Sequence, residues 1–175
     1  MNFVTTKTAA DTINTECLIL GVFREKMIGE TAKYIDKISK KSISKLITSG
    51  DIKTGLGTTK IINNLEGVKA KRVLVVGLGN QDSFEADEYK KACESAMKSI
   101  SGIKLNNFAN YLIVEKVKDL NNYYKSRYFI EAYFSSIYQF NQLKTGKKNK
   151  ISTPTKIIMR ASNSGDSAKI KLGCE

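Results

Sequence analysis

The stretch Lys71-Arg72-Val73-Leu74-Val75-Val76-Gly77-Leu78-Gly79-Asn80 decides the fold class of this chain. Its run of aliphatic residues, rich in valine and without polar alternation, predicts a strand that is buried on both faces. The Gly-Leu-Gly that follows predicts a tight turn. Asp82, with Glu85 three residues later, predicts an acidic cap at the start of a helix. Strand, glycine turn and helix in this order predict the centre of an α/β sheet.

This turn does not match the dinucleotide-binding fingerprint G-x-G-x-x-G. Gly77 and Gly79 fit the first two glycines, but Asp82 occupies the third position. The third glycine allows close packing of the helix on the strand, and a carboxylate there would face the pyrophosphate. We therefore interpret the two glycines as structural.

The glycine-rich segment Ser49–Thr59 does not match a phosphate-binding P-loop either. Gly50 and Gly55 have the separation of G-x-x-x-x-G-K-[ST], but Leu56 stands in the position of the lysine. That lysine supplies the charge that neutralises the phosphates. We expect a connection into a strand at 60–62 instead.

The rest of the chain shows strand and helix patterns in alternation. Further strands are predicted at 1–7, where the strand is an edge candidate, and at 16–23, 111–117 and 155–160. A helix is predicted at 31–47, either continuous or broken near 40–42. The helix that ends before Ser101 carries one apolar face of Tyr89, Cys93, Ala96, Met97 and Ile100. A basic connector is expected at 145–150, and a helical pattern begins after 162 and stops with the chain.

Composition excludes several kinds of chemistry. The 175 residues contain no histidine, which excludes Ser-His-Asp and Cys-His catalysis and His-ligated zinc. Cys17, Cys93 and Cys174 lie far apart without a Cys-x-x-Cys motif, which favours unpaired thiols in a reducing compartment. No segment approaches the ~20 apolar residues of a membrane span, and the first residues do not resemble a secretory signal. These features predict a cytoplasmic protein without a membrane partner.

The net charge of +12 leaves two interpretations open. It is compatible with a nucleic-acid partner or with a solvated, lysine-rich surface. Only four of the 29 basic residues are arginine, the side chain on which specific base contacts depend most. We favour the solvated surface.

The segment 121–143 predicts an unusually aromatic helix. It contains Tyr123, Tyr124, Tyr128, Phe129, Tyr133, Phe134, Tyr138 and Phe140, and a stripe of Phe129, Tyr133, Ile137 and Phe140 follows helical spacing. Aromatic side chains interleaved with cations are typical of a single-strand stacking platform. They are also typical of a helix that packs on a sheet while its outer side meets another domain or subunit, and we favour this second interpretation.

Four features in this order resemble the N-terminal domain of the leucyl (cytosol) aminopeptidase family, of the bacterial PepA-like type. They are the strand Glu16–Phe23, the glycine loop Gly50–Thr59, the central Arg72–Gly79, and the helix end with its basic continuation at Ile137–Lys148. Each feature alone has low specificity, but together they span nearly the whole chain.

The resemblance implies a macro-domain-like, three-layer α/β fold with a mixed β-sheet flanked by helices. Residues 1–161 would form the non-catalytic N-terminal domain, and 162–175 would begin the linker helix to an absent C-terminal catalytic domain. The parent protein would be a cytoplasmic homohexameric hydrolase that removes N-terminal residues from peptides. Two divalent metal ions, manganese or zinc, would activate a water molecule in its catalytic domain.

No catalytic, metal or cofactor-binding residue is transferred to this chain by the resemblance. The family's metal ligands include its Asn-Thr-Asp-Ala-Glu-Gly-Arg-Leu signature, which does not occur here. The carboxylates Asp82, Glu85, Asp87 and Glu88 are better explained by a helix N-terminus than by a metal site. Two alternatives remain: a nucleic-acid-binding module, for which DNA would be the partner, and a macro-type nucleotide or ADP-ribose binder that would use Gly77-Leu78-Gly79.

Overall fold

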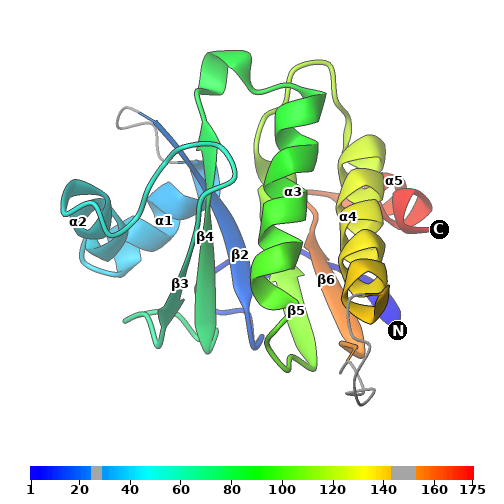
Figure 1. The fold of residues 1–175 in the computed structure, drawn as a ribbon, viewed down its shortest axis with the longest axis horizontal. Coiled ribbons are helices and arrows are strands. Elements are labelled where there is room, and N and C mark those ends of the chain that lie inside the picture. Colours follow the sequence, from blue (N-terminus) through cyan, green and yellow to red (C-terminus); the bar gives the residue numbers. More distant parts are fainter. Residues whose placement is uncertain (25–28, 143–152) are drawn as a thin grey trace.

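The computed structural model of the protein describes residues 1–24, 29–142 and 153–175, without the side chains of 139–142. Six strands form one mixed sheet in the order β1-β6-β5-β2-β4-β3 (Figure 1). Every neighbouring pair is parallel except β3 and β4, which are antiparallel. The strands are β1 (Asn2–Thr6), β2 (Leu18–Phe23), β3 (Thr59–Asn63), β4 (Arg72–Gly79), β5 (Asn107–Asn110) and β6 (Lys156–Arg160).

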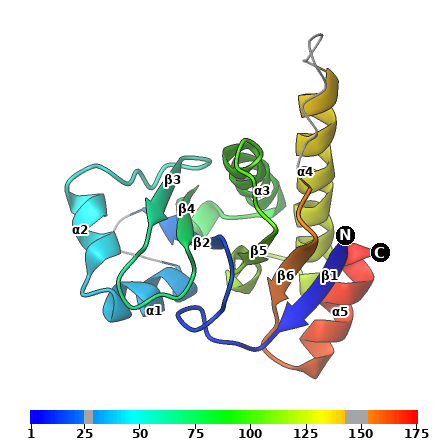
Figure 2. The same ribbon diagram turned by 90° about the horizontal axis from the view of Figure 1, so that it is seen from below.

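Helices cover both faces of this sheet, as Figure 2 shows in the view along the strands. On one face lie α1 (Glu30–Ile38) and α2 (Ser42–Thr48), and on the other lie α3 (Ala86–Ile100) and α4 (Asn122–Gln142). The last helix, α5 (Ser164–Cys174), packs against α4 and the edge strand β1. The predicted three-layer α/β fold is therefore confirmed.

The two central strands, β2 and β4, are buried on both faces, as the aliphatic run predicts. Their side chains alternate between two cores: Leu18, Leu20, Val73 and Val75 face α1 and α2. Ile19, Leu74, Val76 and Leu78 face α3 and α4. Burial of a side chain of this size contributes roughly 1.5–3 kcal/mol, so this pair of strands supplies much of the stabilisation.

The predicted helix at 31–47 is broken into α1 and α2. Lys40 and Lys41 both adopt positive φ angles, of 54° and 62°, which end one helix and reorient the chain for the next. The buried Asp36 carboxylate accepts hydrogen bonds from the backbone N–H of Ser44 (2.8 Å) and from its hydroxyl (2.5 Å). This contact fixes the angle between the two helices.

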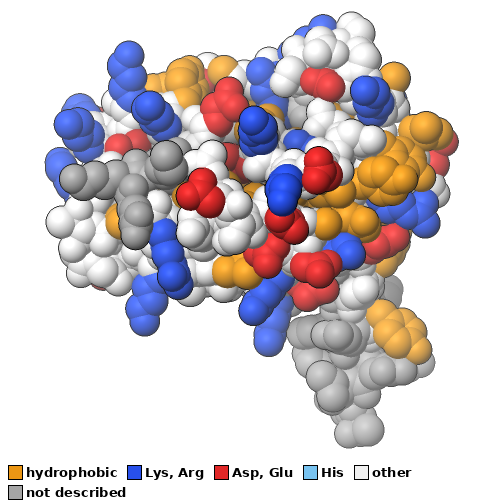
Figure 3. Space-filling model, turned by 90° about the horizontal axis from the view of Figure 1, so that it is seen from above, with side chains coloured by type: hydrophobic (Ala, Val, Ile, Leu, Met, Phe, Trp, Pro, Cys, Tyr) orange, Lys and Arg blue, Asp and Glu red, His pale blue; other side chains and the backbone are white. Residues whose placement is uncertain are grey.

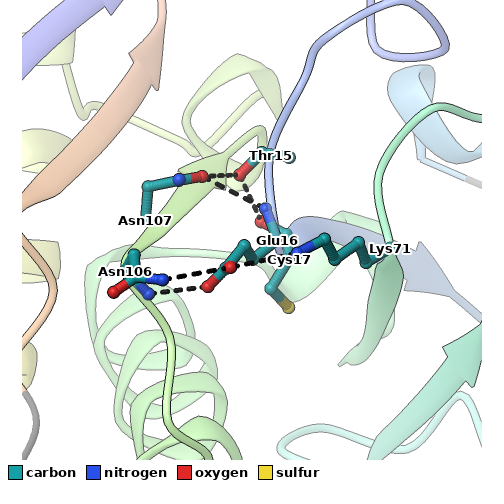
Figure 4. A network of polar contacts seen from close by, with 6 residues as sticks. All are labelled: Thr15, Glu16, Cys17, Lys71, Asn106 and Asn107. Carbon is teal, nitrogen blue, oxygen red and sulfur yellow. Dashed lines mark hydrogen bonds and ion pairs between the residues drawn. The ribbon is translucent and has the colours of Figure 1, made fainter.

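A polar network fixes the amino ends of β2 and β5 (Figure 4). The Glu16 carboxylate accepts hydrogen bonds from the backbone N–H of Asn106 (2.6 Å) and the Lys71 ammonium (3.2 Å). The Asn107 side-chain oxygen accepts from the Thr15 hydroxyl (2.9 Å) and the Glu16 N–H. The backbone hydrogen bond from Asn106 and the Lys71 cation together lower the pKa of Glu16.

The predictions for the segment after β5 and for the cap of α3 are wrong. The strand expected at 111–117 lies earlier, at Asn107–Asn110, and a 3₁₀ turn occupies Leu112–Val114. The apolar run is buried, but in the crossover that follows β5 rather than in the sheet. The second error is the helix cap: Asp82 lies in a 3₁₀ turn, and α3 starts after Glu85. The basic connector at 145–150 lies outside the described residues.

Candidate functional site

Gly77 and Gly79 do not form a turn, because both lie within β4, and they offer no backbone to a ligand. The loop before β3 covers them: the N–H of Gly77 donates to the Thr58 carbonyl (2.7 Å), and the N–H of Gly79 donates to the Thr54 carbonyl (3.0 Å). A Cβ at Gly77 would lie 2.2 Å from the Gly55 carbonyl oxygen. The two glycine-rich motifs therefore pack against each other. The turn predicted at Gly77-Leu78-Gly79 is wrong: these glycines lie in β4 and allow the backbone of the 54–58 loop to approach the strand closely.

The carboxylates near the start of α3 serve the helix terminus. The Glu88 carboxylate accepts a hydrogen bond from the backbone N–H of Glu85 (3.1 Å), and Asp87 occupies the first turn. Among the described residues, no group of three or more His, Cys, Asp or Glu side chains is placed to hold a metal ion.

The three cysteines carry free thiols. Cys17, just before β2, and Cys93, on α3, are buried in the same core, and Cys174 is partly buried at the end of α5. Burial raises the pKa of Cys17 to about 12 and the pKa of Cys174 to about 11. The thiolate, which is the reactive form, is therefore suppressed at neutral pH, and these side chains pack as small apolar groups.

The carboxyl ends of the parallel strands, where α/β sheets usually bind ligands, carry a partly filled cleft. At this edge of the sheet lies Glu115, a residue 3% exposed, whose carboxylate accepts a hydrogen bond from the backbone N–H of Glu30 at the start of α1 (3.3 Å). A Cβ at Gly29 would lie 2.5 Å from the other carboxylate oxygen, so the contact is tight. Burial raises the pKa of Glu115 to about 7. The helix N-terminus, an ordinary anion site, is thus occupied by the chain's own carboxylate.

The cleft contains two hollows, and Val114, the residue before Glu115, lines both of them. One, of about 310 Å³, lies against α1 and Tyr111; the other, of about 250 Å³, lies at the start of α4 beside Lys125. Arg160 and Ser162 line both of them. Lys125 is buried, and burial lowers its pKa to about 8. Sequence reasoning missed Glu115 and Lys125, because an isolated Glu or Lys carries no signal of burial.

The aromatic helix α4 divides into a buried stripe and an exposed side. Phe129 and Tyr133 of the predicted stripe are buried, and Ile137 is partly buried. The side chain of the fourth member, Phe140, lies outside the described residues. Tyr124, Phe134 and Tyr138 are exposed, by 45%, 51% and 64%. This exposed side is compatible with the predicted contact to another domain or subunit.

Tyr123, Tyr124 and Tyr128 form a run of aromatic contacts along the first turns of α4, and Lys90 lies 4.5 Å from the Tyr128 ring centre. The cations beside this run have carboxylate partners: Lys90 contacts Asp87, and Arg127 contacts Glu131. A phosphate backbone would have to compete with these ion pairs.

The face at the carboxyl ends of the strands carries basic and acidic side chains together (Figure 3). Figure 3 shows the face at the carboxyl ends of the strands, where acidic side chains lie among the Lys and Arg side chains. Hydrophobic side chains gather on the α4–α5 side of the same face. This distribution agrees with the solvated-surface interpretation of the net charge of +12. Within the described part of the chain, no helix is both long and apolar enough to cross a membrane.

Comparison with known proteins adds an independent line of evidence. Residues 19–147 match the cytosol aminopeptidase family, N-terminal domain. A probable cytosol aminopeptidase from Haemophilus ducreyi is 28% identical over 173 residues, which cover 99% of this chain and 35% of that protein. The chain thus spans about a third of the length of this curated relative.

Solved structures confirm the fold. A mutant of tomato leucine aminopeptidase matches 99% of this chain and 35% of its own length, with a TM-score of 0.72 at 15% identity. A Trypanosoma brucei macrodomain matches 97% of this chain and 65% of its own length, with a TM-score of 0.70 at 8% identity. The macro-domain-like architecture is shared by both, and the sequence match decides between them. The chain belongs to the cytosol aminopeptidase family, through its N-terminal domain.

Proposed function

We propose that this chain is the non-catalytic N-terminal domain of a two-metal leucyl aminopeptidase. The observation that carries the proposal is the family match over residues 19–147, together with relatives that are nearly three times as long. In this proposal residues 1–161 form the domain, and 162–175 begin the linker helix to the catalytic domain. The domain would serve assembly and access to the active site.

The chemistry of the parent enzyme would belong to its catalytic domain. Two divalent ions, manganese or zinc, would bridge and activate a water molecule there and polarise the scissile carbonyl. The substrates would be peptides, cleaved at their N-terminal residue, and the enzyme would be a cytoplasmic homohexamer. The exposed side of α4, which includes Phe134 and Tyr138, supports a role in contacts with another domain or subunit.

The alternatives receive less support from the geometry. For a nucleotide binder, the Gly77-Leu78-Gly79 backbone is covered by the 54–58 loop, and the N-terminus of α1 holds Glu115. For a nucleic-acid module, Lys90 and Arg127, which lie beside the α4 tyrosines, are paired with carboxylates.

The test is expression of the whole reading frame that contains this chain, with and without residues 1–161. We expect the complete protein to release N-terminal leucine from a chromogenic substrate only when manganese or zinc is supplied, and the 175-residue chain alone to be inactive. Removal of 1–161 should change the oligomer size in sedimentation. A complete protein that is inactive with both metals contradicts the proposed enzyme. If the complete protein is active but removal of 1–161 leaves its oligomer size unchanged, only the proposed role of the domain is contradicted.

A further inference from the structure

Lys125 is a buried cation without a bonded carboxylate among the described residues. It is 6% exposed, and its ammonium donates hydrogen bonds to the carbonyl oxygens of Ile113 (2.6 Å) and Glu115 (3.1 Å). An ammonium has three donors, so one remains after these two bonds. The carboxylates that act on it electrostatically are those of Glu115 and Asp166, and neither is hydrogen-bonded to it in the described structure. A buried charge in this position favours a nearby anion.

The hollow beside Lys125 is lined by cations and neutral groups. Lys116, Lys125 and Arg160 supply positive charge, Asn122 and Ser162 supply neutral donors, and the other lining residues are aliphatic. None of its described lining residues is acidic. The guanidinium of Arg160 donates from one nitrogen to the carbonyls of Thr6 and Ala161, which leaves its other N–H groups for a ligand.

The position and size of the hollow suit a small oxyanion. It lies where β5 and β6 end and where α4, a helix of 21 residues, begins with Asn122. The positive end of the α4 dipole adds to the charge of the three cations. Its volume of about 250 Å³ exceeds that of several water molecules, at about 30 Å³ each in the liquid, so a phosphate group fits.

The adjoining features restrict the ligand to one phosphate group. A second phosphate would be expected at the N-terminus of α1, but the Glu115 carboxylate already accepts the Glu30 N–H there. The neighbouring hollow, which shares Arg160 and Ser162, is bordered by Tyr34 and Tyr111 and offers space for an organic group.

We propose that the hollow formed by Lys116, Lys125 and Arg160 binds a small anion with a single phosphate group, either inorganic phosphate or a phosphomonoester. The hollow is assigned no part in the proposed aminopeptidase chemistry, so this inference stands or falls independently of it.

The test is calorimetric titration of the 175-residue chain with inorganic phosphate, at pH 7 and at an ionic strength held constant with sodium chloride. At this pH Lys125, with a pKa of about 8, is mostly protonated. We expect saturable binding, and we expect Lys125→Met to weaken it by about tenfold or more, the effect of one hydrogen bond to a charged group. Lys116→Met, at an exposed residue, should weaken binding severalfold without unfolding the protein.

Lys98→Met is the matched control, because Lys98 is an exposed lysine in the last turn of α3 and does not line the hollow. It should leave phosphate affinity unchanged. A parallel titration with AMP separates the two sources: tighter binding than phosphate identifies a monoester, and equal or weaker binding identifies the free ion. The proposal is overturned if phosphate gives no heat beyond that of chloride, or if Lys98→Met weakens binding as much as Lys116→Met.

Discussion

At the scale of single residues, Gly77 is a position where the packing leaves no room for a side chain. An added methyl group would meet the Gly55 carbonyl oxygen and the Thr58 hydroxyl, both held by backbone pairing of the 54–58 loop with β4. We expect Gly77→Ala to lower the free energy of unfolding by about 1–3 kcal/mol or more, measured by urea denaturation. Gly102→Ala is the control, since no atom lies within 4 Å of its added carbon. Equal stability of the two variants would contradict the packing described here.

Glu115 gives the fold a dependence on pH that an exposed glutamate would not give. Burial raises its pKa from 4.5 to about 7, so the folded protein binds this proton more tightly than the unfolded chain does. The contribution of Glu115 to stability is therefore greatest below pH 4.5 and decreases as pH rises to about 7. The loss is on the order of 3 kcal/mol.

This pH effect is measured by urea denaturation at pH 5 and pH 7.5, for the natural chain and for Glu115→Gln. In the variant, the free energy of unfolding should not show this decrease between pH 5 and pH 7.5. Glu16, whose pKa is lowered, titrates below this window and serves as an internal control. A natural chain that becomes more stable from pH 5 to pH 7.5, relative to the variant, would refute a buried carboxyl with a raised pKa.

At the scale of elements, the start of α3 depends on Glu88 rather than on Asp82. The Glu88 carboxylate satisfies the N–H of Glu85, which is one of the donors that a helix start leaves unpaired. We expect Glu88→Ala to cost about 0.5–2 kcal/mol of unfolding free energy in urea denaturation. Glu94→Ala, at an exposed position within the same helix, should cost less than about 0.5 kcal/mol. If Glu94→Ala lowered the free energy of unfolding more than Glu88→Ala does, Glu88 would not be the residue that caps α3.

The two sides of α4 should respond differently to truncation. Phe129 is fully buried and contacts the Phe108 ring, with the ring centres 6.2 Å apart, whereas Phe134 is 51% exposed. Phe129→Ala should destabilise the fold by about 3–5 kcal/mol, and Phe134→Ala by less than about 1 kcal/mol, in thermal or urea unfolding. A severe loss from Phe134→Ala would mean that this side chain stabilises the domain itself and is not free for another surface.

The elements that could be predicted from the sequence are those in which the spacing of apolar residues and the length of the segment indicate the same type of secondary structure. The aliphatic run 73–76 of the central strand, the helix face of Tyr89, Cys93 and Met97, and the edge position of β1 all match, whereas β4 continues through the glycines at 77–79, where a turn was predicted. The strand β5 was misplaced because Asn107 and Asn110 are unfavourable strand residues, and the apolar run that follows them looks more like a strand. That apolar run is buried because the crossover after β5 packs against the rest of the fold, and a local sequence pattern does not predict such packing.

The cleft could not be predicted because its chemistry depends on long-range placement. Glu115 and Lys125 come from a crossover turn and a helix, and Arg160 comes from the end of a distant strand. Only the parallel order of β5 and β6 brings them to one edge of the sheet. The glycine pair was recognised as structural, but its reason, the covering loop, is a tertiary contact.

At the scale of the whole molecule, the net charge of +12 predicts only weak and unspecific attraction to DNA. On the face shown in Figure 3, acidic side chains lie between the basic ones, so few phosphate contacts can form there at once. In gel-shift or anisotropy titrations we expect any binding at low salt to vanish by about 0.15 M, without preference for a sequence. A sequence-specific complex that survives at 0.15 M salt would restore the nucleic-acid alternative.

The central claim, that this domain is the N-terminal part of a two-metal aminopeptidase, is tested most directly by the reading frame beyond codon 175 in the source DNA. We predict that it continues for roughly two further domains' length and encodes the signature Asn-Thr-Asp-Ala-Glu-Gly-Arg-Leu. A stop codon directly after Glu175, or a continuation without that signature, would contradict the claim and leave a binding function for this domain.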